Sequence, residues 1–130
     1  MPITALYASL LALIFLALSV RVIGFRRVVR IGLGDGGDTA LLRRVRVHAN
    51  FAEYVPLCLI LIGLAESLRA PSLLLHGLGG LLLAARMSHA FGVSRQPETF
   101  AWRVAGMAGT LTVLGLAAAF CLYSAARSGG

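Results

Sequence analysis

The sequence holds 130 residues, the length of one domain, but 58% of them are hydrophobic and only 13% are charged. With a mean hydropathy of +0.86, this composition is typical of a small integral membrane protein. The long apolar stretches exclude a secreted disulfide scaffold, a disordered chain and a nucleic-acid-binding module. The net charge of +7 comes from arginines alone, which cluster at the ends of apolar segments, where they can meet lipid headgroups or an anionic substrate.

The first apolar run covers residues 2–20 and ends at Arg21. No basic segment precedes it, as a cleavable signal peptide would need, so we expect a transmembrane helix over about residues 3–24. A basic loop follows, with the glycine-rich segment 32–38. Its glycines superficially resemble a dinucleotide-binding fingerprint, but no strand precedes them. We therefore predict a loop with positive φ, in which Asp38 or Thr39 caps the next helix.

Three further apolar segments predict helices over about residues 39–68, 72–92 and 98–125, joined by short connections at 66–71 and 94–98. The whole chain, 1–130, is thus expected to form one domain of four transmembrane helices. Cys58 and Cys121 lie singly in apolar runs, with no spacing that indicates a metal or redox site. We interpret both as small buried hydrophobic residues and expect no metal.

The arginines also predict the orientation of the chain, because short loops rich in basic residues stay on the cytoplasmic side. The loop after the first helix, with the start of the second, and the region joining the third and fourth helices hold most of them: Arg21, Arg26, Arg27, Arg30, Arg43, Arg44, Arg46, Arg86, Arg95 and Arg103. Only Arg69 and Arg127 lie on the other side. We expect both termini outside, both basic loops in the cytoplasm, and the unusual polar residues near one membrane face.

A polar stripe runs along the first half of the second helix. At about 100° per residue, Arg46, Asn50 and Glu53 fall within about 60° of one another, with Tyr54 beside them. A charged side chain within the bilayer costs about 2.5–3.5 kcal/mol, so Glu53 must face a partner, a cavity or a ligand. An internal salt bridge to an arginine is one alternative. His48 lies on roughly the opposite face from Arg46, and either reaches a shared ligand from another subunit or forms a helix–helix hydrogen bond.

A second polar group lies where the third and fourth helices meet. Arg86 and His89 are three residues apart and share a helix face. Arg103 lies in the first turns of the fourth helix, whose N-terminus also favours an anion. These arginines and Arg95 could all extend to lipid headgroups instead, and we favour that interpretation for Arg95. For Arg86 and Arg103, whose depth matches that of Glu53, we expect an anion site.

The string Arg46-x-His48-x-Asn50-x-x-Glu53-Tyr54-x-Pro56 closely resembles the signature of the MAPEG superfamily, the membrane-associated proteins of eicosanoid and glutathione metabolism. The four-helix layout, the long loop after the first helix and the Arg86 and His89 pair extend the likeness over nearly the whole chain. The segment Gly34-Asp-Gly-Gly-Asp38 is most similar to the short bacterial branch of the family.

The resemblance implies an all-α, antiparallel bundle of four transmembrane helices, assembled as a homotrimer in the bacterial inner membrane. Glutathione would bind between neighbouring subunits at the cytoplasmic side. The residues that would hold it, carried over position by position, are Arg46, Asn50, Glu53 and Tyr54, with His48 reaching it from an adjoining chain. Arg86 matches a glutathione-contacting arginine, Arg103 matches an arginine beside the thiol, and Arg26 or Arg27 resembles an arginine near the site.

The chain departs from the family at the end of the third helix. Where the eicosanoid synthases have tyrosines after the helix 3 arginine, this sequence has His89 and Val93. His89 would therefore give a changed ring contact with glutathione, and a second ring contact is lost. The difference bears on thiol activation more than on binding.

The chemistry of glutathione matches these residues. Its two carboxylates, ammonium group and thiol call for several guanidinium groups, one carboxylate and neutral donors. A permanent charge at Arg103 would lower the thiol pKa from about 8.5 toward neutrality and keep the nucleophilic thiolate ready. The first hypothesis is thus a glutathione-dependent transferase or peroxidase acting on hydrophobic electrophiles or lipid hydroperoxides.

Two alternatives remain. The chain could be a non-catalytic membrane protein that binds a lipid or an amphipathic anion in the same crevice between subunits. It could also be a purely structural bundle whose glycines serve close helix packing, although this would leave Glu53 unexplained.

Overall fold

The computed structural model describes residues 1–95, 97 and 99–130, which form four long helices. They are α1 (Pro2–Val29), α2 (Thr39–Ser67), α3 (Ser72–Ser94) and α4 (Phe100–Ser128). The described residues contain no strand, and the predicted all-helical bundle is confirmed. The first helix continues past residue 24, to Val29. The predicted start of the last helix at residue 98 lies outside the described residues, as does part of the predicted 94–98 connection.

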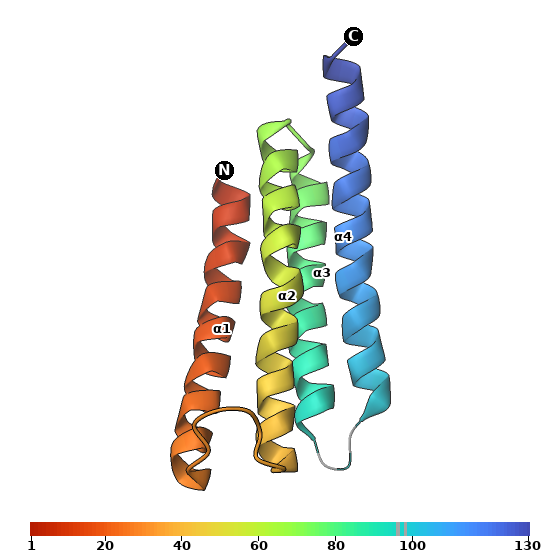
Figure 1. The fold of residues 1–130 in the computed structure, drawn as a ribbon. Helices are drawn as coiled ribbons and strands as arrows, with labels where there is room; N and C mark the ends of the chain where they lie inside the picture. The colour runs from red at the N-terminus through yellow and green to blue at the C-terminus, as the bar shows by residue number, and fades with distance from the viewer. Residues whose placement is uncertain (96, 98) are drawn as a thin grey trace.

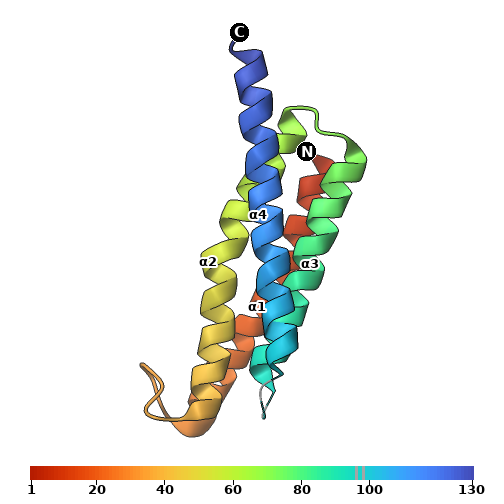
Figure 2. The ribbon, with the colours of Figure 1, turned by 90° about the vertical axis from the view of Figure 1, so that its right-hand side faces the viewer.

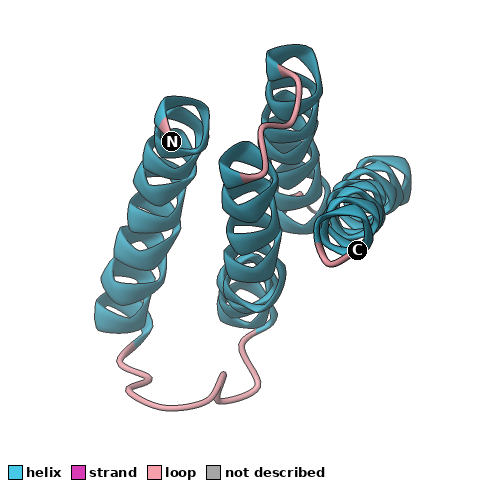
Figure 3. Ribbon diagram, turned by 90° about the horizontal axis from the view of Figure 1, so that it is seen from above, coloured by secondary structure: helices cyan, strands magenta, loops and turns pink. Residues whose placement is uncertain are grey.

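The helices run alternately in opposite directions, so both termini lie at one end of the bundle and the two longer connections at the other (Figure 1). Helix α1 contacts α2 and α3 but not α4 in the described residues, whereas α3 and α4 make the most extensive contact. Figures 2 and 3 show α1 and α4 on opposite sides of the α2 and α3 pair. The bundle is therefore open, and each outer helix leaves a long apolar side uncovered.

Helices α1, α2 and α4 are long and apolar enough to cross a membrane. Helix α3 has 23 residues, about 34 Å at 1.5 Å per residue, which is also a membrane-crossing length. It buries Arg86 and His89 among the other helices, so these polar side chains are kept from lipid.

Carboxylates cap two of the helices. The Asp38 carboxylate accepts a hydrogen bond from the Leu41 N–H at 2.9 Å and caps α2, so Asp38 is the cap of the two predicted, Asp38 and Thr39. At the other end of the bundle, Glu66 accepts hydrogen bonds from the N–H groups of Ile3, at 3.0 Å, and Thr4, at 2.7 Å, so the end of α2 caps the start of α1. The loop glycines Gly34, Gly36 and Gly37 have positive φ, also as predicted.

Two glycines set the distance between α3 and α4. A Cβ atom on Gly106 would lie 2.5 Å from the backbone nitrogen of His89, and one on Gly92 would lie 2.5 Å from the backbone nitrogen of Arg103. Because neither residue has a Cβ, the backbones approach closely at both points. This approach brings His89 and Arg103 to the same region of the bundle.

The cysteines occupy apolar surroundings. Cys58 is fully buried in the core, and the Cys121 thiol donates to the Leu61 carbonyl at 3.4 Å. Both are free thiols.

Candidate anion-binding site

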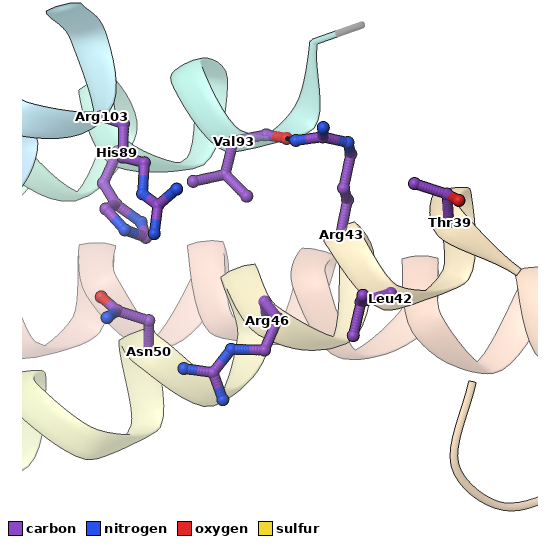
Figure 4. Close-up of a pocket in the computed structure, with 8 residues that line it drawn as sticks. All are labelled: Thr39, Leu42, Arg43, Arg46, Asn50, His89, Val93 and Arg103. Atoms are coloured by element: carbon purple, nitrogen blue, oxygen red, sulfur yellow. Dashed lines mark hydrogen bonds between the residues drawn. The ribbon is translucent and has the colours of Figure 1, made fainter. Parts of the chain in front are cut away.

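A pocket of about 220 Å³ opens between α2 on one side and α3 and α4 on the other, at the end of the bundle that carries the basic connections. Figure 4 shows His89 and Arg103 facing Asn50 across this space, with Arg46 beside them on α2. We call it the polar pocket. Its lining residues are Thr39, Leu42, Arg43, Arg46, Asn50, His89, Val93 and Arg103.

Four of the residues predicted from the sequence come together in this pocket. Arg46 and Asn50 lie one turn apart on α2, His89 lies near the end of α3, and Arg103 lies in the first turn of α4. Together with Arg43, they give the pocket three guanidinium groups, and none of the described residues that line it carries a carboxylate. This charge balance favours an anionic ligand.

Arg86 does not line the polar pocket but lies directly behind it. Its side chain is only 1% exposed. One terminal nitrogen donates to the Asn50 Oδ1 at 2.6 Å and to the His89 Nδ1 at 3.3 Å. The other donates to the Thr110 hydroxyl at 3.3 Å. Arg86 therefore contacts pocket residues from two helices and ties them to α4.

These hydrogen bonds determine what the pocket offers to a ligand. A guanidinium group only donates, so the His89 Nδ1 must accept and its proton must lie on Nε2. Asn50 likewise presents its oxygen to Arg86, which leaves its NH₂ group for other partners. Arg86 thus orients Asn50 and sets the tautomer of His89, so that both present donors in a pocket already rich in guanidinium groups.

Glu53 and Tyr54 lie outside the polar pocket. Glu53 is exposed and Tyr54 is half-buried, although both follow Asn50 on α2 within about a turn. No ion pair joins Glu53 to Arg46 or to any other described residue, so the internal salt bridge that the sequence left open is not formed within the described chain. A carboxylate is thus exposed on the side of a membrane-length helix.

His48 and Arg26 are also placed away from the polar pocket. The His48 Nε2 lies 3.0 Å from the Ser19 hydroxyl, and its ring stacks on Phe15 at a centroid distance of 4.6 Å. Within one subunit, His48 therefore makes the helix–helix hydrogen bond considered as an alternative. Arg26 donates to the Ile31 and Gly34 carbonyls at 3.2 and 2.7 Å and holds the loop that follows α1.

Sequence reasoning did not single out Arg43 and Thr110 as contributors to this site. Arg43 precedes Arg46 by three residues and Asn50 by seven, a spacing that places all three on one helix face, so its position could have been found. Thr110 lies in an apolar stretch of α4, where nothing in the sequence indicates that it receives a hydrogen bond from Arg86.

Comparisons with known proteins place this arrangement in a family. The MAPEG family matches residues 4–123. Two relatives, each named Inner membrane protein YecN, come from Escherichia coli K12 and from Escherichia coli O6:H1. Each is 36% identical over 112 residues, which cover 86% of this chain and 84% of the relative. The predicted inner-membrane localisation agrees with the name of these relatives and with the membrane-length helices. The chain is a member of the MAPEG family of membrane proteins.

Proposed function

We propose that this chain is a glutathione-dependent transferase or peroxidase, acting on hydrophobic electrophiles or lipid hydroperoxides. The observation that carries the proposal is the polar pocket, where three guanidinium groups meet the oriented Asn50 and His89. The carboxylates and thiolate of glutathione are the kind of anionic groups that such donors bind. Membership of a family that includes proteins of glutathione metabolism supports this choice of ligand.

Three residues of the pocket act directly on glutathione in this proposal. Arg46 and the NH₂ group of Asn50 bind glutathione carboxylates, and Arg103 stabilises the thiolate. The thiolate attacks an electrophilic carbon and forms a thioether as the leaving group departs. With a hydroperoxide, it takes the terminal oxygen, releases an alcohol after protonation, and yields glutathione disulfide and water with a second glutathione.

A homotrimer is part of the proposal. Support comes from Glu53, a carboxylate exposed on a membrane-length helix, and from the uncovered sides of α1 and α4. A neighbouring subunit would shield Glu53 from lipid, and Glu53 could then pair with the glutathione ammonium group. Sedimentation analysis of the detergent-purified protein should give the mass of three 13.7 kDa chains. A monomer would contradict this part of the proposal.

Calorimetric titration of glutathione into the detergent-purified protein tests the function. The wild-type protein and Arg127→Ala should bind glutathione saturably, because Arg127 lies at the opposite end of the bundle. Arg46→Ala and Glu53→Gln should bind at least about tenfold more weakly, since each loses a charged partner. No heat and no thermal stabilisation of the wild-type protein at millimolar glutathione would reject the proposal.

A non-catalytic role is the second candidate, in which the crevice between subunits binds a lipid or an amphipathic anion. Val93 favours it, because this buried aliphatic residue lines the pocket and offers no ring hydroxyl. Glutathione-dependent turnover of a hydrophobic electrophile distinguishes the two candidates. Turnover supports the enzyme, and saturable anion binding without turnover supports the binding protein.

A further inference from the structure

A second pocket, of about 200 Å³, lies beside the polar pocket and shares Arg43 with it. We call it the Ser94 pocket, and its lining residues are Ala40, Arg43, Arg44 and Ser94. Arg21 of α1 reaches it, because its terminal nitrogen donates to the Ser94 hydroxyl at 2.8 Å. Three helices therefore contribute to one small space.

Arg21 and Arg44, two of the arginines around the Ser94 pocket, are held by neutral partners. Arg43 donates to the Val93 carbonyl at 3.2 Å, and Arg44 donates to the Ala40 carbonyl at 3.1 Å. Arg44 also lies over the Phe25 ring, 3.9 Å from its centroid. Arg44 is close enough to Arg21 for the two charges to repel each other. The fold thus fixes like charges near one another in half-buried positions.

No carboxylate in the described part of the chain pairs with Arg21 or Arg44. Asp35 accepts a hydrogen bond from the Gly37 N–H, and Asp38 caps α2. Glu66 lies at the opposite end of the bundle, where it caps α1. Arg21 and Arg44 bring two positive charges together, each with neutral partners only, and this favours a bound anion, more strongly where the charges are partly shielded from water.

The depth of the cluster indicates which anion is available. The charge-free run before Arg21 has 19 residues, from 2 to 20, and spans about 28 Å, close to the thickness of the hydrocarbon core. Arg21 therefore lies at the level of the lipid phosphates, and Arg43 and Arg44 in the first turns of α2 lie beside it. The Ser94 hydroxyl accepts from Arg21 and donates to no described residue, so its proton can meet a phosphate oxygen.

We propose that the Ser94 pocket binds the phosphate group of an anionic phospholipid, independently of any ligand in the polar pocket. Arg21 and Arg44 supply charge, and the Ser94 hydroxyl supplies a donor. A free phosphate ion has the same binding chemistry but lacks the acyl chains that keep a lipid at this depth.

Native mass spectrometry of the detergent-purified protein tests this site, with phosphatidylglycerol, phosphatidylcholine and inorganic phosphate as separate probes. The paired substitution Arg21→Gln with Arg44→Gln should lower phosphatidylglycerol retention about tenfold or more. Arg27→Gln with Arg30→Gln is the matched control, because it removes the same charge from exposed residues at the same end of the bundle. The control and the wild-type protein should both prefer phosphatidylglycerol to phosphatidylcholine.

Three results would overturn the proposal. An equal loss of phosphatidylglycerol retention in the two paired variants would mean that lipid binding depends only on the net charge of the protein. Equal retention of the two lipids by the wild-type protein would mean that no headgroup site exists. Displacement of phosphatidylglycerol by millimolar phosphate would assign the pocket to the free ion. If the Arg21→Gln with Arg44→Gln variant changes its oligomeric size, the single variant Arg44→Gln replaces it. A threefold loss of phosphatidylglycerol retention in this variant supports the site, and unchanged retention overturns it.

Discussion

Arg86 shows how one buried side chain can control a pocket that it does not line. Its guanidinium group joins Asn50 of α2, His89 of α3 and Thr110 of α4. Burial of a charged group is costly unless its donors are satisfied, and of the three guanidinium nitrogens of Arg86 the Nε alone has no partner among the described residues. The planar fork of an arginine matches these separate acceptors, which a lysine ammonium group cannot all reach.

Arg86→Lys should therefore weaken glutathione binding about tenfold while keeping the positive charge, because Asn50 and His89 lose their fixed orientation. Calorimetric titration measures the loss, and Arg95→Lys, at an exposed position, serves as the control. Nitrogen NMR of the imidazole groups distinguishes a loss of the His89 orientation from a general loss of structure. The His89 ring should change from the Nε2-protonated form to a mixture of tautomers, and an unchanged ring and affinity would refute the role.

Arg103 is the residue to which we assign stabilisation of the thiolate. Arg103→Ala should lower the rate of glutathione conjugation by about 10²-fold, the loss that is typical when an enzyme loses one group that stabilises charge in its active site. Binding should change less, since Arg46 and Asn50 remain in place. Comparison of kcat with the glutathione dissociation constant checks this split. A variant with unchanged turnover would remove the catalytic assignment.

At the scale of helices, the contact between α3 and α4 positions the pocket. Gly106 lies where a Cβ would come within 2.6 Å of the Ala85 carbonyl, whereas nothing lies within 4 Å of the corresponding position on Gly115. Both glycines are on α4, so they form a matched pair.

Gly106→Ala should destabilise the protein by about 1–3 kcal/mol, because the added methyl group forces α3 and α4 apart. Gly115→Ala should leave stability unchanged or raise it, since alanine favours helix and meets no neighbour. Thermal unfolding in detergent compares the two variants. Equal melting temperatures would show that the close approach of α3 and α4 does not limit stability.

The helices and part of the site follow from sequence because local signals determine them. Membrane-length apolar runs predict α1, α2 and α4, and Asp38 was identified as a cap from its place before an apolar helix. The face shared by Arg46 and Asn50 follows from helical periodicity alone. The position of Arg86 behind the pocket depends on Thr110, 24 residues away on another helix. No local pattern encodes that contact.

The whole bundle is open, with α1 and α4 apart (Figure 3). Most of its arginines lie toward the end that carries the connections after α1 and after α3. The positive-inside rule predicts that this end lies in the cytoplasm. In a variant whose own cysteines are replaced, a thiol at Ser128→Cys should react with a membrane-impermeant maleimide in intact spheroplasts. A thiol at Leu33→Cys, in the exposed loop after α1, should react only after lysis. The reverse pattern would invert the orientation.

The assembly cannot be read from one chain, because contacts between subunits leave no local pattern except unpaired polar groups. Glu53 is such a group. The sequence predicts that it faces a partner, a cavity or a ligand, and its exposure on α2 agrees with a partner outside this subunit. His48 is the opposite case. Its contacts with Ser19 and Phe15 account for it within one subunit, so a second role across an interface stays a prediction.

Binding of glutathione as its thiolate in the polar pocket is the basis of the proposed function. An ultraviolet difference spectrum of the detergent-purified protein, titrated with glutathione at neutral pH, tests it. We expect a thiolate absorbance that grows and saturates with glutathione, and that is strongly reduced in Arg103→Ala. A mixture whose spectrum equals the sum of free protein and free glutathione, up to millimolar glutathione, would contradict it.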